Sequence, residues 1–181
     1  MRTRRDLMTG GVALVLAGLA KPALANVLHS PARTLSFENL HTGEKLNLEY
    51  WAGGQYVPQA LTSINYLLRD YRSGEVHPIR PDLLDLLHVL HGQLGSAKPF
   101  EVISGYRSPG TNAKLHQRSN GVAAHSLHMD GMAIDIRLPD RQLADLHKAA
   151  LAMRAGGVGY YPSLDFVHVD VGRVRRWGAV G

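Results

Sequence analysis

The chain of 181 residues contains no cysteine. Disulfide bonds and thiolate metal ligands are therefore excluded, and any metal ion would have to be bound by histidine, carboxylate and water. Charged residues are also scarce, at 19% against 45% hydrophobic residues, a balance that is typical of a globular protein and not of a disordered one. The length suits one domain that can bury a sizeable core.

The amino terminus has the pattern of a secretion signal. Three arginines within residues 2–5 precede an uncharged apolar run over residues 10–19, and Ala23-Leu24-Ala25 fits a small-x-small cleavage site. The pair Arg4-Arg5 resembles a twin-arginine export motif, the alternative being an ordinary secretion signal with a chance arginine pair. We expect residues 1–25 to be a signal peptide, residues 26–181 to be the mature exported domain in the periplasm, and no membrane span to remain after cleavage.

Once that signal is set aside, the chain has little excess charge. The formal net charge is +5, and residues 1–25 contribute +3 through four basic residues and one aspartate, which leaves +2. No block of lysine and arginine with interleaved aromatics remains, apart from Arg173, Arg175 and Arg176 near the end. We therefore expect no nucleic-acid partner, and a mildly basic exported domain suits a polyanionic cell wall.

The apolar pattern predicts short strands and amphipathic helices without repeats or linkers. Alternation and short apolar runs indicate strands at residues 34–39, 45–50, 100–104, 133–138, 158–161 and 166–171. The first two form a hairpin with Leu35, Phe37, Leu46 and Leu48 on its inner face. Helical spacing indicates helices at residues 58–71, 81–94 and 111–118, and one from Asp140, as its cap, to about residue 155. This pattern predicts an α+β domain in which a small antiparallel sheet carries helices packed on one side.

Two short runs contain the residues that could bind a metal. On the strand at 133–138, Asp135 faces away from the core-facing isoleucines, and on the last strand His168 faces away from the valines. If these strands pair antiparallel, both side chains project from one face of the sheet, and His128 can close a triangle from the preceding loop. A catalytic zinc takes three protein ligands and leaves a fourth position for water. We therefore predict one Zn²⁺ bound by these three residues.

The first run carries a specific resemblance. Ser126-x-His128-x-x-Gly131-x-Ala133-x-Asp135 matches every fixed position of the signature of the zinc D-Ala-D-Ala peptidase superfamily, which includes the hedgehog fold. The chain is most similar to the branch of exported murein endopeptidases that was first catalogued as a domain of unknown function. The segments that carry this resemblance are residues 104–109, 156–162 and 166–170. The resemblance covers roughly residues 58–177 and implies a zinc peptidase, hedgehog-like fold.

The resemblance also implies roles for individual residues. It implies that His128, Asp135 and His168 are the zinc ligands and that Arg107 holds a substrate carbonyl or carboxylate oxygen. A guanidinium near the metal would stabilise the oxyanion of a tetrahedral intermediate.

The general base is where the sequence departs from the family. The carboxypeptidase relatives have Glu-x-x-His, whereas position 165 here is Asp165, whose side chain is one methylene shorter. Asp170 is the rival, either as the base or as a partner of a ligand histidine, and His125 is a third candidate, as base or as oxyanion donor. We expect one of the two aspartates to be the base, and the choice between them stays open here.

The resemblance and the export signal together predict a zinc metallopeptidase that hydrolyses the peptide cross-links of peptidoglycan. D,D-endopeptidase, L,D-endopeptidase and carboxypeptidase activity are all compatible with the motifs, and the bond would join D-Ala to meso-diaminopimelate or two meso-diaminopimelates. The expected partner is the peptide stem, and we expect a monomer. The alternatives are a zinc-containing module that binds wall peptide without cleaving it, and a purely structural zinc site. A retained carboxylate base favours the enzyme, and three ligands without a fourth Cys or His favour an open metal position.

Overall fold

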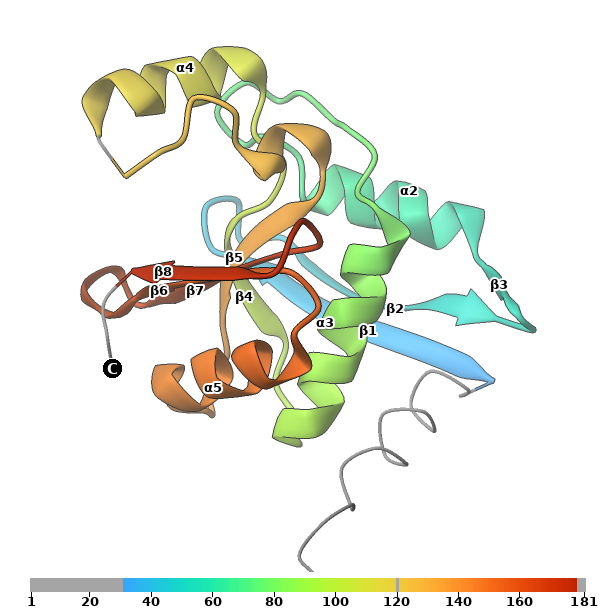
Figure 1. The fold of residues 1–181 in the computed structure, drawn as a ribbon. Coiled ribbons are helices and arrows are strands. Elements are labelled where there is room, and N and C mark those ends of the chain that lie inside the picture. The colour runs from blue at the N-terminus through green and yellow to red at the C-terminus, as the bar shows by residue number, and fades with distance from the viewer. Residues whose placement is uncertain (1–30, 120, 179–181) are drawn as a thin grey trace, which may run out of the picture.

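The computed structural model describes residues 31–119 and 121–178 (Figure 1). The predicted signal peptide lies outside these residues. The strands are β1 (Ala32–Asn39), β2 (Lys45–Ala52), β3 (Gln55–Tyr56), β4 (Phe100–Ser104), β5 (Ala133–Arg137), β6 (Gly157–Tyr161), β7 (Phe166–Asp170) and β8 (Arg175–Gly178). The helices are α2 (Pro58–Leu67), α3 (Pro81–Leu94), α4 (Pro109–Arg118) and α5 (Leu143–Met153), with short 3₁₀ segments η1 (Leu127–Asp130) and η2 (Pro162–Leu164). Within the described residues, none of the helices has the length and apolar character that crossing a membrane requires.

The strands form one mixed sheet of eight, in the order β3-β2-β1-β4-β5-β7-β6-β8. The predicted hairpin is confirmed, because β1 and β2 pair antiparallel with Leu35 opposite Leu48 and Phe37 opposite Leu46. Strand β5 pairs antiparallel with both β4 and β7, and β7 pairs antiparallel with β6. The α+β class is therefore confirmed, and two parallel pairings, β1 with β4 and β6 with β8, make the sheet mixed.

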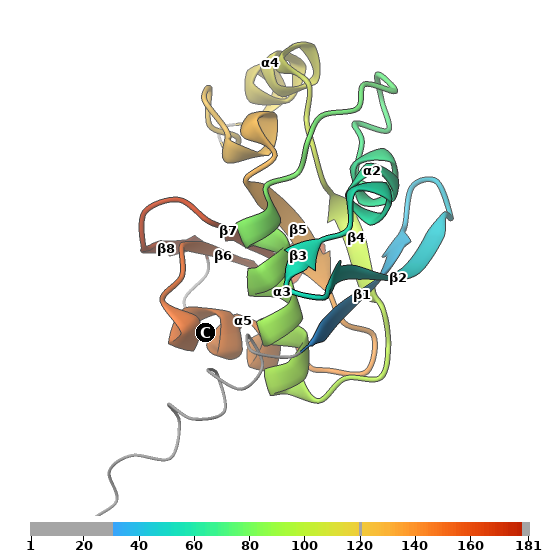
Figure 2. The ribbon, with the colours of Figure 1, turned by 90° about the vertical axis from the view of Figure 1, so that its right-hand side faces the viewer.

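One face of this sheet builds the core. The inward residues of the central strands join one buried cluster with residues of α2, α3 and α5; its fully buried members include Phe37, Ile64, Leu84, Leu87, Phe100, Ile134, Ile136 and Leu146. Figures 1 and 2 show α3 and α5 covering this face, whereas α4 and η1 lie on the other side of the sheet. The polar residues that alternate with the core residues of β5 and β7 therefore face the side of α4.

The helices lie where the pattern predicts them, but three boundaries differ. Helix α2 ends at Leu67 and not at residue 71, and α4 begins at Pro109 and not at residue 111. Helix α3 begins at Pro81, where the missing N–H costs nothing, and ends at Gly95, which adopts the left-handed conformation with φ of 58°. The predicted cap at Asp140 is wrong, because α5 begins at Leu143 after Gln142. The Asp140 carboxylate instead accepts a hydrogen bond from Ser96 Oγ at 2.7 Å, which links the loop after β5 to the loop after α3.

Candidate active site

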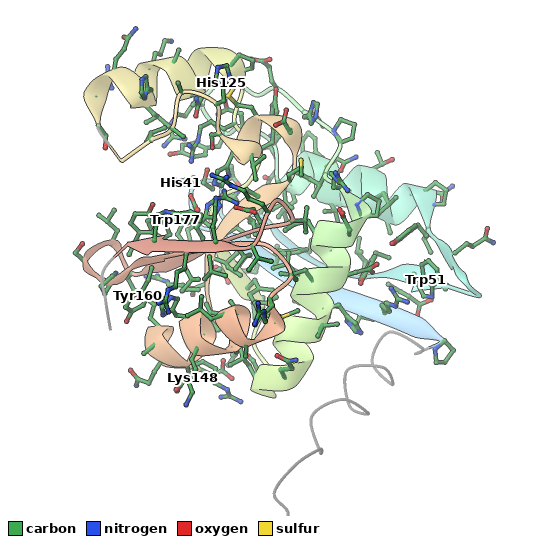
Figure 3. The ribbon with its side chains drawn as sticks, viewed as in Figure 1. His41, Trp51, His125, Lys148, Tyr160 and Trp177 are labelled. Atoms are coloured by element: carbon green, nitrogen blue, oxygen red, sulfur yellow. The ribbon has the colours of Figure 1, made fainter. Side chains whose placement is uncertain are left out.

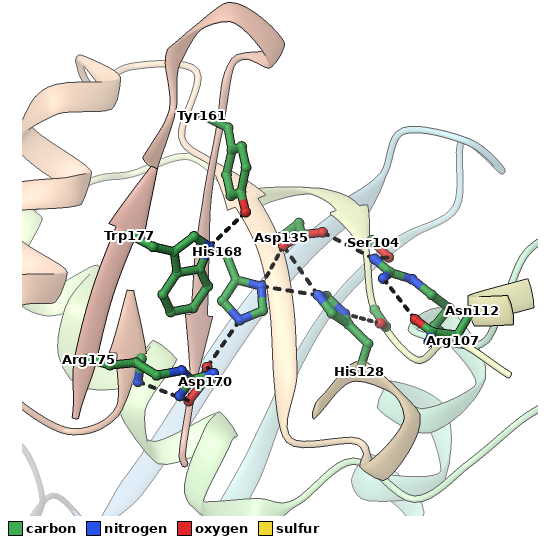
Figure 4. A network of polar contacts seen from close by, with 12 residues as sticks. Ser104, Arg107, Asn112, His128, Asp135, Tyr161, His168, Asp170, Arg175 and Trp177 are labelled. Carbon is green, nitrogen blue, oxygen red and sulfur yellow. Dashed lines mark hydrogen bonds and ion pairs between the residues drawn. The ribbon is translucent and has the colours of Figure 1, made fainter. Parts of the chain in front are cut away.

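Three side chains converge on the face of the sheet opposite the core (Figure 4). Asp135 of β5 and His168 of β7 are direct cross-strand partners, so their side chains project side by side, as predicted. His168 Nδ1 lies 2.9 Å from Asp135 Oδ1, and His128 Nε2 lies 3.1 Å from His168 Nδ1 and 3.3 Å from Asp135 Oδ1. One ligand atom from each residue falls within 4.8 Å of the others, an arrangement that could hold one metal ion. We refer to these three residues as the metal group.

A tight turn delivers His128 to this group. Gly131 ends η1 with φ of 63°, and a Cβ atom there would lie 2.2 Å from the carbonyl oxygen of Pro78. Only glycine accepts both the left-handed conformation and so close an approach. The turn directs the chain from η1 straight into β5, and this short connection brings His128 beside Asp135.

The second nitrogen of each histidine ring is fixed by a protein oxygen. His128 Nδ1 donates to the carbonyl oxygen of Gly105 at 2.7 Å, and His168 Nε2 donates to Asp170 Oδ2 at 3.2 Å. His128 therefore keeps Nε2 free of a proton when its ring is neutral, and this nitrogen is directed at the metal group. Both nitrogens of His168 face a carboxylate, and its Nδ1 is free for a metal ion when the proton of the neutral ring lies on Nε2, next to Asp170. Metal-binding histidines are commonly oriented in this way.

Burial and mutual charge set the protonation of the group, which is nearly inaccessible to solvent. Burial alone would raise the pKa of Asp135, but the two histidines outweigh it and hold that pKa far below its ordinary range. Burial lowers the pKa of His128. For His168 burial acts in the same direction, but hydrogen bonds to Asp135 and Asp170 outweigh it and raise its pKa. An ionised carboxylate and a neutral His128 are the forms that bind a metal ion.

Arg107 lies beside the metal group and is loosely held. Its Nη2 lies 3.6 Å from Asp135 Oδ2 and 3.3 Å from Ser104 Oγ, and its Nη1 donates to Asn112 Oδ1 at 3.4 Å. The Nε atom is buried and has no hydrogen-bond partner among the described residues. Burial lowers the pKa of this guanidinium. A buried cation with long bonds can still bind an anionic ligand.

A cavity of about 330 Å³ opens over the metal group. Arg107 and His125 line it on the side of α4, and Tyr161, Phe166 and Trp177 line it on the side of the sheet edge. Figure 3 shows His125 next to α4 and Trp177 on the sheet. His125 thus faces the cavity from the loop after α4, and it is not one of the three residues that could hold the ion.

The structure places the two candidate aspartates differently. Asp170 is fully buried, and its oxygens accept hydrogen bonds from the backbone N–H groups of Gly157 and Gly172, from Arg175 and from His168. Asp165 is exposed, forms an ion pair with Arg137 and lines a separate cavity together with that arginine.

Sequence reasoning missed the role of β8 in the site. Trp177 of β8 packs against the His168 ring, with 5.1 Å between ring centroids, and its Nε1 donates to Tyr161 Oη at 2.7 Å. Arg175 of the same strand holds Asp170. The sequence of β8 does not alternate between apolar and polar residues, so the pattern does not predict a strand there. The one signal of an aromatic neighbour was Gly159, a glycine within a strand that is followed by Tyr160 and Tyr161.

The fold and site define a class: an α+β metallopeptidase-like domain with a buried His–Asp–His group below a cavity and an arginine at its rim. The chain belongs to the family described as peptidoglycan L,D-endopeptidase MepK, whose model matches residues 28–177. It is 47% identical over 174 residues to the peptidoglycan L,D-endopeptidase MepK of Escherichia coli K12, covering 96% of each chain. It is 40% identical over 178 residues to the probable peptidoglycan L,D-endopeptidase MepK of Haemophilus influenzae, covering 98% of this chain and 96% of the relative. The predicted family is confirmed.

Proposed function

We propose that this protein is a zinc-dependent murein endopeptidase that hydrolyses peptide cross-links of peptidoglycan. The observation that carries the proposal is the buried metal group, which lies at the base of an open cavity next to an arginine with unused hydrogen-bonding capacity. The names of the relatives favour the L,D bond, between two diaminopimelate residues, over the D,D bond. The export pattern of residues 1–25 supports a place in the periplasm, where the peptide stems are the partner and the protein acts as a monomer.

The donor set fits zinc. Two imidazole nitrogens and one carboxylate oxygen are ligands that zinc accepts readily, and three protein ligands leave a position for water. The ionised carboxylate and the orientation of the rings support this assignment, since all three side chains already point to one place. When bound, zinc would supply Lewis acidity, which polarises a carbonyl and lowers the pKa of water.

Arg107 holds the substrate in this proposal. Its guanidinium would bind the scissile carbonyl oxygen, or the carboxylate on the leaving amino acid, and would stabilise negative charge in the transition state. The weak contacts to Ser104 and Asn112 cost little to exchange for a charged ligand. A lysine could not provide the same forked geometry.

The geometry changes the roles of the candidate bases. Both oxygens of Asp170 already accept hydrogen bonds, so we assign it the task of orienting His168. Asp165 interacts with Arg137 at another cavity, which argues against proton transfer at the metal group. His125 lines the cavity and remains the candidate for moving a proton between water and the leaving amine.

The test is a digest of purified sacculi by the zinc-loaded protein, followed by separation of the muropeptides. We expect dimers cross-linked through two diaminopimelates to disappear and the corresponding monomers to appear. The matched control is His168→Ala, which should lose both zinc and activity. Intact dimers beside an active control enzyme would refute the endopeptidase proposal and favour the binding module, and loss of D,D-linked dimers alone would refute the L,D assignment.

A further inference from the structure

Four positions form one row across the sheet at the candidate site. Asp135 on β5 pairs with His168 on β7, His168 pairs with Gly159 on β6, and Gly159 pairs with Trp177 on β8. Neighbouring positions in such a row direct their side chains to the same face. Two of the four belong to the metal group, and the glycine leaves a gap between His168 and Trp177.

Two aromatic rings occupy the space above that glycine. A Cβ atom at Gly159 would lie 2.7 Å from the Trp177 ring and 2.9 Å from the Tyr161 ring, closer than carbon atoms can approach. The Trp177 ring also contacts His168, and the Tyr161 ring stacks on Phe166 with 4.6 Å between centroids. The absence of a side chain at Gly159 therefore allows the indole of Trp177 and the phenol of Tyr161 to pack at the edge of the metal group.

The hydrogen bond between the two rings has a defined direction. An indole N–H can only donate, so Tyr161 Oη is the acceptor of the 2.7 Å bond from Trp177 Nε1. The hydroxyl keeps its own proton, and among residues 31–119 and 121–178 no acceptor for that proton is found. Tyr161 lines the cavity above the metal group, and Figure 4 shows its hydroxyl end directed toward Asp135 and His168. The proton is thus available to a ligand in the cavity.

We propose that Tyr161 is a catalytic residue that donates a hydrogen bond to the scissile carbonyl oxygen as negative charge develops on it. Trp177 is then a positioning residue, which fixes the direction of the hydroxyl. Arg107 reaches the same cavity from the side of α4, so the developing oxyanion has a donor on each side of the metal group. Preorganised donors of this kind stabilise a transition state without reorientation at the moment of reaction. The inference rests on the proposed endopeptidase function.

Tyr161→Phe tests the role of the hydroxyl, since it keeps the ring on Phe166 and removes only the oxygen. In the zinc-loaded full chain we expect kcat on cross-linked muropeptide dimers to fall by about 10²–10³-fold. Affinity for a phosphinate analogue, which mimics the tetrahedral oxyanion, should fall by a similar factor, while zinc content and Tm stay unchanged. The matched control is Tyr160→Phe on the same strand, because Tyr160 stacks on His147 on the opposite face of the sheet and should tolerate the change.

Trp177→Phe tests the positioning role, since it removes the indole donor and keeps an aromatic ring. We expect about a tenfold loss of kcat and of phosphinate affinity, and no further loss when this change is added to Tyr161→Phe. A Tyr161→Phe variant with wild-type kcat and phosphinate affinity, or losses that multiply in the double variant, would overturn the inference and leave the endopeptidase function standing. A zinc-loaded wild-type chain that cleaves no dimer would overturn the function and the inference together.

Discussion

Replacing Asp170 by asparagine should impair zinc binding through His168, although Asp170 itself contacts no metal in our account. Asp170 Oδ1 accepts the backbone N–H groups of Gly157 at 2.9 Å and Gly172 at 2.8 Å, together with Arg175 Nη1 at 3.1 Å. Oδ2 accepts His168 Nε2 at 3.2 Å and Arg175 Nη2 at 2.8 Å. An asparagine presents an NH₂ group in place of one of these oxygens, and it would meet three donors on the first side and two on the second.

The amide nitrogen should therefore take the Oδ2 position and donate to His168 Nε2. That nitrogen then becomes an acceptor, and the proton of the neutral ring moves to Nδ1, the atom that faces His128 and Asp135. A protonated Nδ1 cannot bind a metal ion. Loss of a partner that orients a metal ligand weakens metal affinity by about 10–100-fold, or roughly 1.4–2.8 kcal/mol.

The assay is competition for zinc between the protein and a chromogenic chelator of known affinity. Asp165→Asn makes the same chemical change at an exposed carboxylate and is the control, for which we expect wild-type zinc affinity. The reasoning about the tautomer is refuted if Asp170→Asn binds zinc as tightly as the wild-type protein. Circular dichroism of both variants checks that each retains the wild-type fold.

Three further predictions address the site and its support. Asp165→Asn should retain activity within about twofold and lose less than about 1 kcal/mol of stability, because its ion pair with Arg137 is exposed; a loss of kcat above tenfold in the sacculus digest would restore Asp165 as the base. Arg107→Lys should lower kcat/KM by about 10²-fold at unchanged zinc content, since a point charge cannot replace the fork; wild-type kinetics would contradict its role. Burial alone would raise the pKa of Asp70, but hydrogen bonds from Thr111 and Ser108 outweigh it and lower that pKa to about 2. The ionised carboxylate should therefore contribute about 2 kcal/mol to stability above its unfolded pKa of about 4. That contribution is lost as pH falls from about 4 to 2, so urea denaturation of wild type and Asp70→Asn should converge over this range, and a constant difference would refute the assignment.

The metal group could be predicted because alternation determines which residues share a face. Once β5 and β7 pair antiparallel, the isoleucines and valines that must be buried leave Asp135 and His168 together on the opposite face. The glycine at position 131 likewise marks the turn that brings His128 to them. Local pattern and long-range pairing agree at these residues, so the sequence was sufficient to predict that the three side chains come together.

The roles of the aspartates depended on partners that local pattern does not reveal. Asp170 is held by Arg175 of β8. That strand pairs in parallel with β6, although its sequence shows no alternation of apolar and polar residues. Asp165 is drawn to Arg137 across the sheet. The different surroundings of the two carboxylates near His168 thus depend on tertiary contacts. The same strand carries Trp177, so the aromatic side of the cavity was equally hidden.

The most direct test of the account is a titration of metal-stripped protein with zinc, in which the cleavage of cross-linked muropeptide dimers is measured at each step. We predict no cleavage without zinc, a linear rise of activity up to one zinc per chain, and a plateau beyond it. The same titration of Asp135→Ala should stay at baseline. Cleavage by the stripped protein, or no cleavage at one bound zinc per chain, would contradict the claim that His128, Asp135 and His168 hold the catalytic ion.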